Sequence, residues 1–325
     1  MISRPDLFIN WADFPSIYEF GKDTLAVHWL EYSGEGVHDY DVRIRFSVDG
    51  GNSWSEDIIP HTDGKKTEHG FVSFFQSPKN EIGMIWLDGR HMSMASDHDH
   101  GGGDMALFTS IFSNDFSQKT ETMLDGKVCE CCPTASWWND DRIVLAYRNR
   151  DDDELRNVHL IEYDKGNWRE LGAITDDKWK IPGCPVNGPS LAGDNQQIGI
   201  LWFTAPDGQA QIKFSQSNNS GKSFSDAIIL SQTTPLGRVD LSYDNSQFFG
   251  SWIEMDESAG CSLVVKIIEN EKNHTNTEIY STDISCDRGS GYPQIEVWEN
   301  QMLILWTLPG ETPKIAGEWI NLEQN

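Results

Sequence analysis

One kind of apolar segment recurs along the whole chain. In each copy, four or five mostly apolar residues run up to an aromatic residue, as in Ile82–Trp86 and Ile198–Trp202. A longer segment in which apolar and polar residues alternate usually follows, as in Tyr40–Ser47. Short runs of this kind, separated by turn residues, predict β-strands. The closing aromatic residues lie 50 to 61 residues apart and are Trp29, Trp86, Tyr147, Trp202, Trp252 and Trp306.

This spacing divides the chain into six similar units. Each unit has a first strand, the strand with the closing aromatic residue, an alternating strand and a looser fourth strand, and such units repeated radially form propeller blades. The last unit lacks a fourth strand, while the apolar segment Leu7–Trp11 precedes the first unit. We therefore predict an all-β fold, a six-bladed β-propeller with four-stranded antiparallel blades, as a single domain over residues 1–325. Leu7–Trp11 is predicted to pair with the last blade and close the ring. A β-sandwich or two smaller barrels would fit the regular spacing less well.

A turn motif follows the third strand of two units. Ser47–Trp54 and Ser217–Phe224 both fit the pattern S-x-[DN]-x-G-x-S-[WF], and Glu162–Trp168 is a degenerate copy that is one residue shorter. We expect the side chain of Asp49 or Asn219 to accept backbone N–H groups within the turn. The glycine of the motif can take a positive φ, and the last aromatic residue can pack between neighbouring sheets. The motif is therefore expected to be structural.

These turns resemble the Asp-box, or BNR repeat, of the sialidase superfamily of six-bladed propellers. The segments WADFPS, TEHGFVS, CECC and GCPVNGPS are also similar to a bacterial sialidase-like subgroup of unsettled function. The resemblance implies a site on the face opposite the Asp-box turns, where the loops before the first strands meet. Met1–Asn10 lacks the apolar core of a signal peptide. Because Asp-box propellers are usually exported, a periplasmic or extracellular location is expected if Met1 replaces a removed signal peptide, and a cytoplasmic location otherwise.

The charge of the chain restricts its partners. It carries 51 acidic and 25 basic residues, which gives a formal net charge of −26. Nucleic acids and anionic membranes are attracted by basic surfaces, so both are disfavoured as partners. No apolar run approaches the roughly 20 residues of a membrane span. A small molecule or a glycan is the expected ligand, and a monomer is the default expectation.

The resemblance also implies candidate catalytic side chains on the functional face. A sialidase-type exo-glycosidase holds the carboxylate of its substrate with arginines. It uses a tyrosine nucleophile, in place of the usual carboxylate, with a glutamate and an acid/base aspartate. Two features depart from that pattern, because WADFPS replaces the Phe/Tyr-Arg-Ile-Pro motif and Asn187 stands where a glutamate is expected. The expected catalytic residues are Asp13 (or Asp88 as the acid), Glu68, Arg90, Arg238 and Tyr292, and the expected ligand-binding residues are His69, Arg148, Asn187, Asp240 and Arg288.

The cysteines support a different function. Cys129, Cys131 and Cys132 lie within four residues, and Cys184 precedes the first strand of the next unit. Thiolates select Cu(I), Zn²⁺ or iron–sulfur clusters, so these four residues are candidate ligands of a copper or zinc ion. Disulfides between Cys132 and Cys184 or between Cys131 and Cys132, and free thiols, are the alternatives. A structural disulfide is the first expectation for Cys261 and Cys286, and further copper or zinc ligands are offered by His91, Met92, Met94, His98 and His100.

A third function needs no catalysis. Propellers commonly bind glycans or proteins in a cleft on one face. Trp137, Trp138 and Trp179 are candidates for stacking on sugars, with ordinary packing between blades as the alternative.

Overall fold

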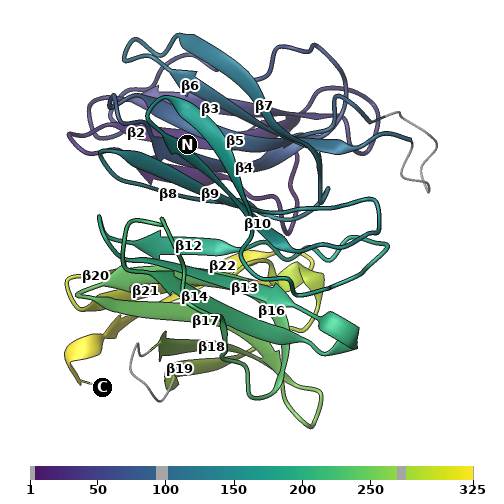
Figure 1. The fold of residues 1–325 in the computed structure, drawn as a ribbon, viewed down its shortest axis with the longest axis vertical. Coiled ribbons are helices and arrows are strands. Elements are labelled where there is room, and N and C mark those ends of the chain that lie inside the picture. Colours follow the sequence, from purple (N-terminus) through teal and green to yellow (C-terminus); the bar gives the residue numbers. More distant parts are fainter. Residues whose placement is uncertain (1–3, 93–101, 269–275, 325) are drawn as a thin grey trace.

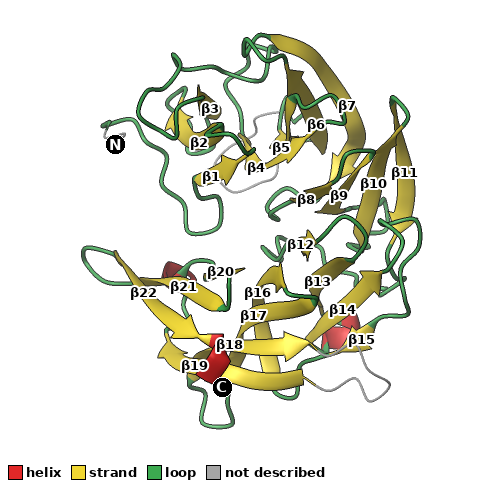
Figure 2. Cartoon of the chain, turned by 90° about the vertical axis from the view of Figure 1, so that its left-hand side faces the viewer, coloured by secondary structure: helices red, strands yellow, loops and turns green. Residues whose placement is uncertain are grey.

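Six antiparallel β-sheets are arranged around a central axis in the computed structural model, which describes residues 4–92, 102–268 and 276–324 (Figure 2). Blades 1 to 3 form one half of the molecule and blades 4 to 6 form the other (Figure 1). Among the described residues, four sheets have four strands and two have three. The predicted six-bladed propeller is therefore confirmed.

The strands follow the predicted units. The first three blades contain β1 (Ser16–Glu19), β2 (Leu25–Tyr32), β3 (Tyr40–Ser47); β4 (His69–Gln76), β5 (Ile82–Asp88), β6 (Met105–Phe112), β7 (Gln118–Val128); β8 (Ala135–Trp138), β9 (Arg142–Arg148), β10 (Val158–Asp164), β11 (Asn167–Ala173). The last three contain β12 (Ser190–Gly193), β13 (Ile198–Thr204), β14 (Gln211–Ser217), β15 (Ile228–Ile229); β16 (Thr234–Asp244), β17 (Gln247–Met255), β18 (Cys261–Ile268), β19 (Asn276–Ile284); β20 (Gln294–Trp298), β21 (Gln301–Leu308), β22 (Lys314–Asn321).

Helices in the described ranges are limited to short 3₁₀ turns. They are η1 (Pro206–Gly208), η2 (Arg288–Ser290) and η3 (Leu322–Gln324). None of the described helices has the length and apolar character needed to cross a membrane.

The N-terminal segment does not close the ring in the way the sequence predicted. Leu7 forms a bridge with Glu31 of β2, and the Phe8 N–H donates to the Leu30 carbonyl at 2.9 Å. The reason is local, because β1 pairs with only four residues of β2 and leaves the rest of that strand edge for the preceding residues. Phe8 also stacks on Tyr40 with ring centroids 3.9 Å apart. The pairing predicted for Leu7–Trp11 with the last blade is therefore wrong, and that blade has three strands.

The recurring aromatic residues form the core between blades. Trp86, Trp202 and Trp252 are fully buried. Each indole N–H still finds an acceptor, at Asp88 (2.7 Å), Asp177 (2.8 Å) and Glu254 (2.5 Å), respectively. A buried tryptophan usually needs such a partner. Several acidic residues of the interior are therefore structural partners of the repeated tryptophans. One of them is Asp88, which the sequence analysis offered as an alternative catalytic acid.

Two of the predicted turns contain the hydrogen bonds expected of them. The Ser53 N–H donates to Asp49 Oδ1 at 2.8 Å, and the Ser223 N–H donates to Asn219 Oδ1 at 3.0 Å. Gly51 and Gly221 have φ values of 86° and 75°, which glycine adopts without strain. The degenerate third copy, Glu162–Trp168, lacks this pattern, because the Glu162 carboxylate instead pairs with Arg142 and Arg169. A similar turn that the sequence analysis missed joins Ser113, Asp115 and Ser117.

Candidate functional site at the mouth of the axis

The inner strands of all six blades surround a cavity of about 220 Å³ on the axis. Each blade contributes at least one residue from its inner strand or from the segment just before it. These lining residues include Asp13, Phe71, Pro133, Gly188, Val239 and Tyr292. The propeller thus brings together side chains from distant parts of the sequence, including the predicted residues Asp13 and Tyr292.

The backbone is strained within or just before several inner strands. Phe71, Val186 and Arg238 have φ values of 55°, 47° and 58°, a region that bulky and β-branched residues rarely adopt. Phe71 and Arg238 also lie within register shifts of β4 and β16. Strain and β-bulges of this kind cluster at functional sites. No sequence signal predicted the positive φ values at these positions, because such values in non-glycine residues are imposed by the surrounding fold.

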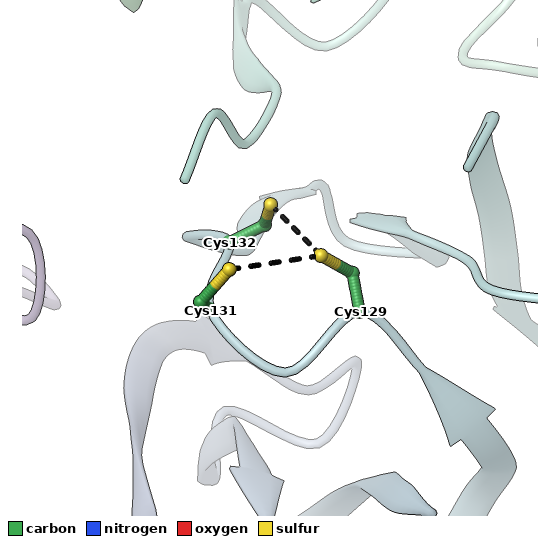
Figure 3. Close-up of side chains that lie close together, drawn as sticks. All are labelled: Cys129, Cys131 and Cys132. Atoms are coloured by element: carbon green, nitrogen blue, oxygen red, sulfur yellow. Dashed lines mark hydrogen bonds between the residues drawn. The ribbon is translucent and has the colours of Figure 1, made fainter. Parts of the chain in front are cut away.

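Three cysteine sulfurs converge beside this mouth (Figure 3). Cys129 directly follows β7, and Cys131 and Cys132 lie in the turn that leads to β8. The Sγ of Cys129 lies 3.1 Å from that of Cys132 and 4.0 Å from that of Cys131. The Cys184 thiol interacts with Cys131. All four cysteines are free, so neither predicted disulfide at this cluster is present in the structure.

The three clustered thiols have different environments. Burial alone would raise the pKa of Cys129. Hydrogen bonds from Cys131 and Cys132, together with the nearby Arg156 guanidinium, have the larger effect and hold the pKa of Cys129 well below its usual value. The Nη1 of Arg156 donates to the Cys129 Sγ at 3.2 Å and to Glu130 at 2.9 Å. The cluster therefore favours one thiolate, at Cys129. Interactions with Cys129 raise the pKa of Cys131, and burial raises that of Cys132.

Tyr292 lies close to the same sulfurs. Its hydroxyl donates to the Val186 carbonyl. Burial raises its pKa well above the usual value, and the charges of Cys132 and Cys131 raise it further. A nucleophilic phenol needs a lowered pKa or an adjacent base. Glu68, the expected base, instead accepts a hydrogen bond from the Tyr40 hydroxyl at 2.6 Å.

The predicted arginine clamp gains no support from the geometry. Arg148 is buried and donates to three backbone carbonyls. Arg238 donates to carbonyls and to the Ser290 hydroxyl. Arg90 pairs with Asp88 and Glu121. Arg288 is exposed beside Trp11, with its guanidinium carbon 5.6 Å from the ring centroid.

Two predicted carboxylates and one amide tie neighbouring blades together. Asp13 accepts the Phe71 N–H at 2.8 Å, and Asp240 accepts the Ile295 N–H at 2.8 Å. Burial raises the pKa of Asp13 to about 8 and that of Asp240 to about 6. The side chain of Asn187 accepts the Arg238 N–H at 2.7 Å. Asp13 and Asp240 also line the axial cavity, so both have a structural contact and access to the candidate site.

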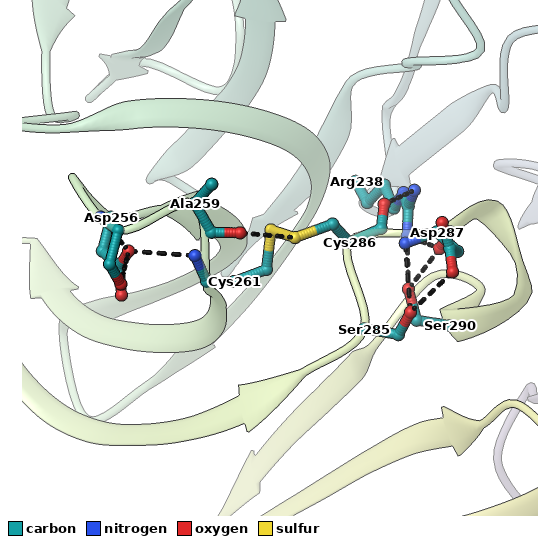
Figure 4. The surroundings of a disulfide bond; sticks show 10 residues. Arg238, Asp256, Ala259, Cys261, Ser285, Cys286, Asp287 and Ser290 are labelled. Carbon is teal, nitrogen blue, oxygen red and sulfur yellow. Dashed lines mark hydrogen bonds between the residues drawn. A yellow bond between two sulfur atoms is a disulfide. The ribbon is translucent and has the colours of Figure 1, made fainter.

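A disulfide supports the rim near Arg238 (Figure 4). Cys261, at the start of β18, is bonded to Cys286, as predicted. The carbonyl of Cys286 accepts a hydrogen bond from Arg238 Nη2 at 3.3 Å. The disulfide therefore links blade 5 to the loop that leads into blade 6.

Other sequence candidates lie elsewhere. Trp137 and Trp179 are buried, and Trp138 packs against Phe20, so these tryptophans serve ordinary packing. His69 packs against His61 and is separate from the axial cavity lining. Met92 packs against the core, and the proposed ligands Met94, His98 and His100 lie outside the described residues.

Sequence reasoning missed Arg156 and Glu130 as partners of the cysteine cluster. Arg156 follows the acidic run Asp151–Glu154, which is typical of a solvated loop. Its side chain is nevertheless buried against Cys129. The position of Glu130 between two cysteines was the one available signal.

The sheets and their order define a six-bladed β-propeller. No protein-family model and no curated protein matches this chain. Among solved structures, it is similar to a protein of unknown function from Dyadobacter fermentans, with a TM-score of 0.63, 14% identity and coverage of 97% of this chain and 96% of that one. It is also similar to a mutant of the NanB sialidase from Streptococcus pneumoniae (TM-score 0.58, 12% identity, 94% and 68% covered). An α-L-arabinanase from Penicillium chrysogenum gives a TM-score of 0.56 at 13% identity, with 96% and 94% covered. At these identities the similarity shows the fold alone.

Proposed function

We propose that this chain binds a soft metal ion, Cu(I) or Zn²⁺, through Cys129, Cys131 and Cys132 at the mouth of the propeller axis. Cys184 is the proposed fourth ligand. The observation that carries the proposal is the convergence of the three sulfurs, with separations from Cys129 of 3.1 and 4.0 Å.

The spacing and the charges suit a thiolate site. Thiolates bound to Zn²⁺ at about 2.3 Å in a tetrahedral arrangement lie roughly 3.8 Å apart. The separation between Cys129 and Cys131 is close to this value, and the shorter one would have to open slightly. Arg156 stabilises the first thiolate, and Glu130 neutralises part of the charge of Arg156. Because the pKa values of Cys131 and Cys132 are raised, we expect metal binding to release protons from them.

Metal titration of reduced protein tests this proposal. We expect the wild-type protein to bind one Cu(I) or Zn²⁺ at the cluster, measured against a competing chromophoric chelator. Cys131→Ser should bind at least about 100-fold more weakly, because losing a ligand exceeds the 10- to 100-fold cost of losing an outer-shell partner. The matched control is the double variant Cys261→Ser and Cys286→Ser, which removes two cysteines outside the cluster. Equal metal binding by wild type and Cys131→Ser would reject the proposal.

Glycoside hydrolysis is a second candidate, favoured by the state of Asp13. A general acid must be protonated at the working pH. Burial raises the pKa of Asp13 to about 8. Asp13 and Tyr292 both line the axial cavity. The fold similarity to a sialidase and an arabinanase is consistent with this activity.

Fluorogenic sialosides and α-L-arabinosides test the hydrolase. If the chain is such an enzyme, Asp13→Asn should lower kcat by about 100-fold or more, the usual contribution of general acid catalysis. Asp240→Asn is the control, since it changes a carboxylate in the same cavity. No turnover of either substrate class by wild-type protein between pH 4 and 8 would argue against this function.

A further inference from the structure

A second group of ligand-type side chains lies at the junction of blades 1 and 2. His61 and His69 stack with ring centroids 3.6 Å apart and an interplanar angle of 2°. Asp63 lies at one end of this stack, with its Oδ1 3.3 Å from both His61 Nδ1 and His69 Nε2. Asp41 lies at the other end, 3.7 Å from His61 Nε2 and 3.8 Å from His69 Nδ1.

The two imidazoles are deeply buried and incompletely bonded. His69 is 0% exposed and His61 is 7% exposed. Within the described part of the chain, neither Nε2 atom has a hydrogen-bond partner of acceptable geometry. An unpartnered polar atom in the interior lowers the stability of the fold and needs an explanation. A bound ion is one such explanation. The His69 Nε2 faces Asp63 and also Asp88, whose Oδ1 is 3.7 Å away.

We propose that this cluster is a binding site for a divalent transition metal ion of the Zn²⁺ class, located at the Asp63 end of the histidine stack. His69 Nε2, His61 Nδ1 and Asp63 are the proposed ligands. Mixed imidazole and carboxylate ligands suit Zn²⁺ and similar ions. The site is independent of the cysteine cluster and has no part in the proposed function above.

The distances fit such an ion. Nitrogen and oxygen ligands about 2.0–2.2 Å from a tetrahedral Zn²⁺ lie roughly 3.3 Å apart, which matches both separations that involve Asp63. The two ring planes are parallel here and would have to tilt for both lone pairs to converge on one ion. Asp88 is already bonded to Trp86 and Arg90, so it serves as a neighbouring negative charge.

The opposite ends of the rings lie near outer groups, although among the residues that the structure describes His61 Nε2 makes no hydrogen bond there. His69 Nδ1 lies 3.3 Å from the Tyr40 carbonyl, and Asp41 lies near the remaining nitrogens of both rings. Metal-binding histidines usually have their other nitrogen held by a carbonyl or a carboxylate. Asp41 is in β3 of blade 1, while His69 is in β4 of blade 2. An ion bound to His69 of blade 2 would therefore be linked to blade 1 only through the outer contact with Asp41.

Metal counting in matched variants tests this site. Protein stripped with a chelator is reloaded with Zn²⁺, and bound zinc is measured by mass spectrometry together with the thermal unfolding midpoint. We expect Cys131→Ser to retain one zinc at the histidine site and to be stabilised by it. Adding His61→Gln to that variant should remove the ion and abolish the thermal shift. His159→Gln is the control, because His159 also lies beside a carboxylate, that of Glu170 at 3.2 Å.

The outcomes separate the two metal sites. Loss of zinc in His61→Gln with retention in His159→Gln supports the histidine site whether or not the cysteines bind metal. Asp63→Asn, a change in the loop before β4, provides a second test if His61→Gln does not fold. Zinc content that is unchanged in both variants, or X-ray absorption showing sulfur ligands alone, would overturn the inference.

Discussion

Replacing Asp13 with asparagine is expected to stabilise the protein at pH 8 and to leave its stability at pH 4 almost unchanged. The carboxyl group is buried and has a pKa of about 8 in the folded protein, against an ordinary value of 3.8. Between these values the folded protein holds a proton that the unfolded chain has released. The free energy of unfolding of the wild type therefore falls as the pH rises from about 4 to about 8.

The size of this effect follows from the shift in pKa, which is about four units. Each pKa unit corresponds to about 1.4 kcal/mol, so the difference between variant and wild type at pH 8 should be on the order of 5 kcal/mol. Asparagine keeps an oxygen that can accept the Phe71 N–H, which Asp13 accepts at 2.8 Å. Urea unfolding at several pH values, followed by tryptophan fluorescence, measures the difference.

A neighbouring carboxylate provides the control for Asp13. Asp240→Asn should show the same sign with a smaller effect, which develops between about pH 4 and 6 and stays constant above pH 6, because the pKa of Asp240 is raised only to about 6. If Asp13→Asn has the same pH profile as the wild type, Asp13 is ionised in the folded protein. That result would also remove the main support for Asp13 as a general acid.

Replacing Arg148 with alanine is expected to have the second large effect, which is a loss of stability. Its guanidinium donates to the carbonyls of Asn187 (2.8 Å), Arg156 (2.6 Å) and Phe203 (2.7 Å). It also lies 4.8 Å from the centroid of the Trp179 ring. Arg148→Ala leaves three buried carbonyls without these donors, so the free energy of unfolding should fall by about 4 kcal/mol.

Two other arginine variants make this prediction specific. Arg148→Lys keeps the charge but cannot reproduce the forked geometry, so it should lie between wild type and alanine. Arg169→Ala removes an exposed arginine paired with Glu162 and should change stability by less than about 1 kcal/mol. Denaturant midpoints measured together compare all three variants. A loss below about 1 kcal/mol for Arg148→Ala would show that Arg148 is available for a ligand, as the sequence alone suggested.

The mouth of the axis combines strain with structural contacts. Arg238 has a positive φ, and its N–H is held by the side chain of Asn187. The main chain of Asn187 is in turn bonded to both Arg148 and the Cys132 sulfur. Residues that the sequence proposed as ligand contacts therefore help to position the cysteine turn. For this reason we expect Arg148→Ala to weaken metal binding at the cysteines as well.

The fold and the cysteine cluster could be predicted from the sequence because both depend on local patterns. Strand alternation and the repeated aromatic residue are properties of short segments, and their spacing counts the blades. Cys129, Cys131 and Cys132 lie within four residues, so any folded chain keeps their sulfurs near one another. The bond between Cys261 and Cys286 was also foreseen, since both were expected near loops of the same face.

Tertiary structure decided the features that depend on residues far apart in the chain. The pairing of Leu7 with Glu31 depends on how much of β2 the short β1 leaves uncovered. The burial of Arg156 against Cys129 and the stacking of His61 on His69 depend on where loops come to rest. Hydrophobic periodicity carries no record of such contacts, because polar side chains meet only after the blades have packed.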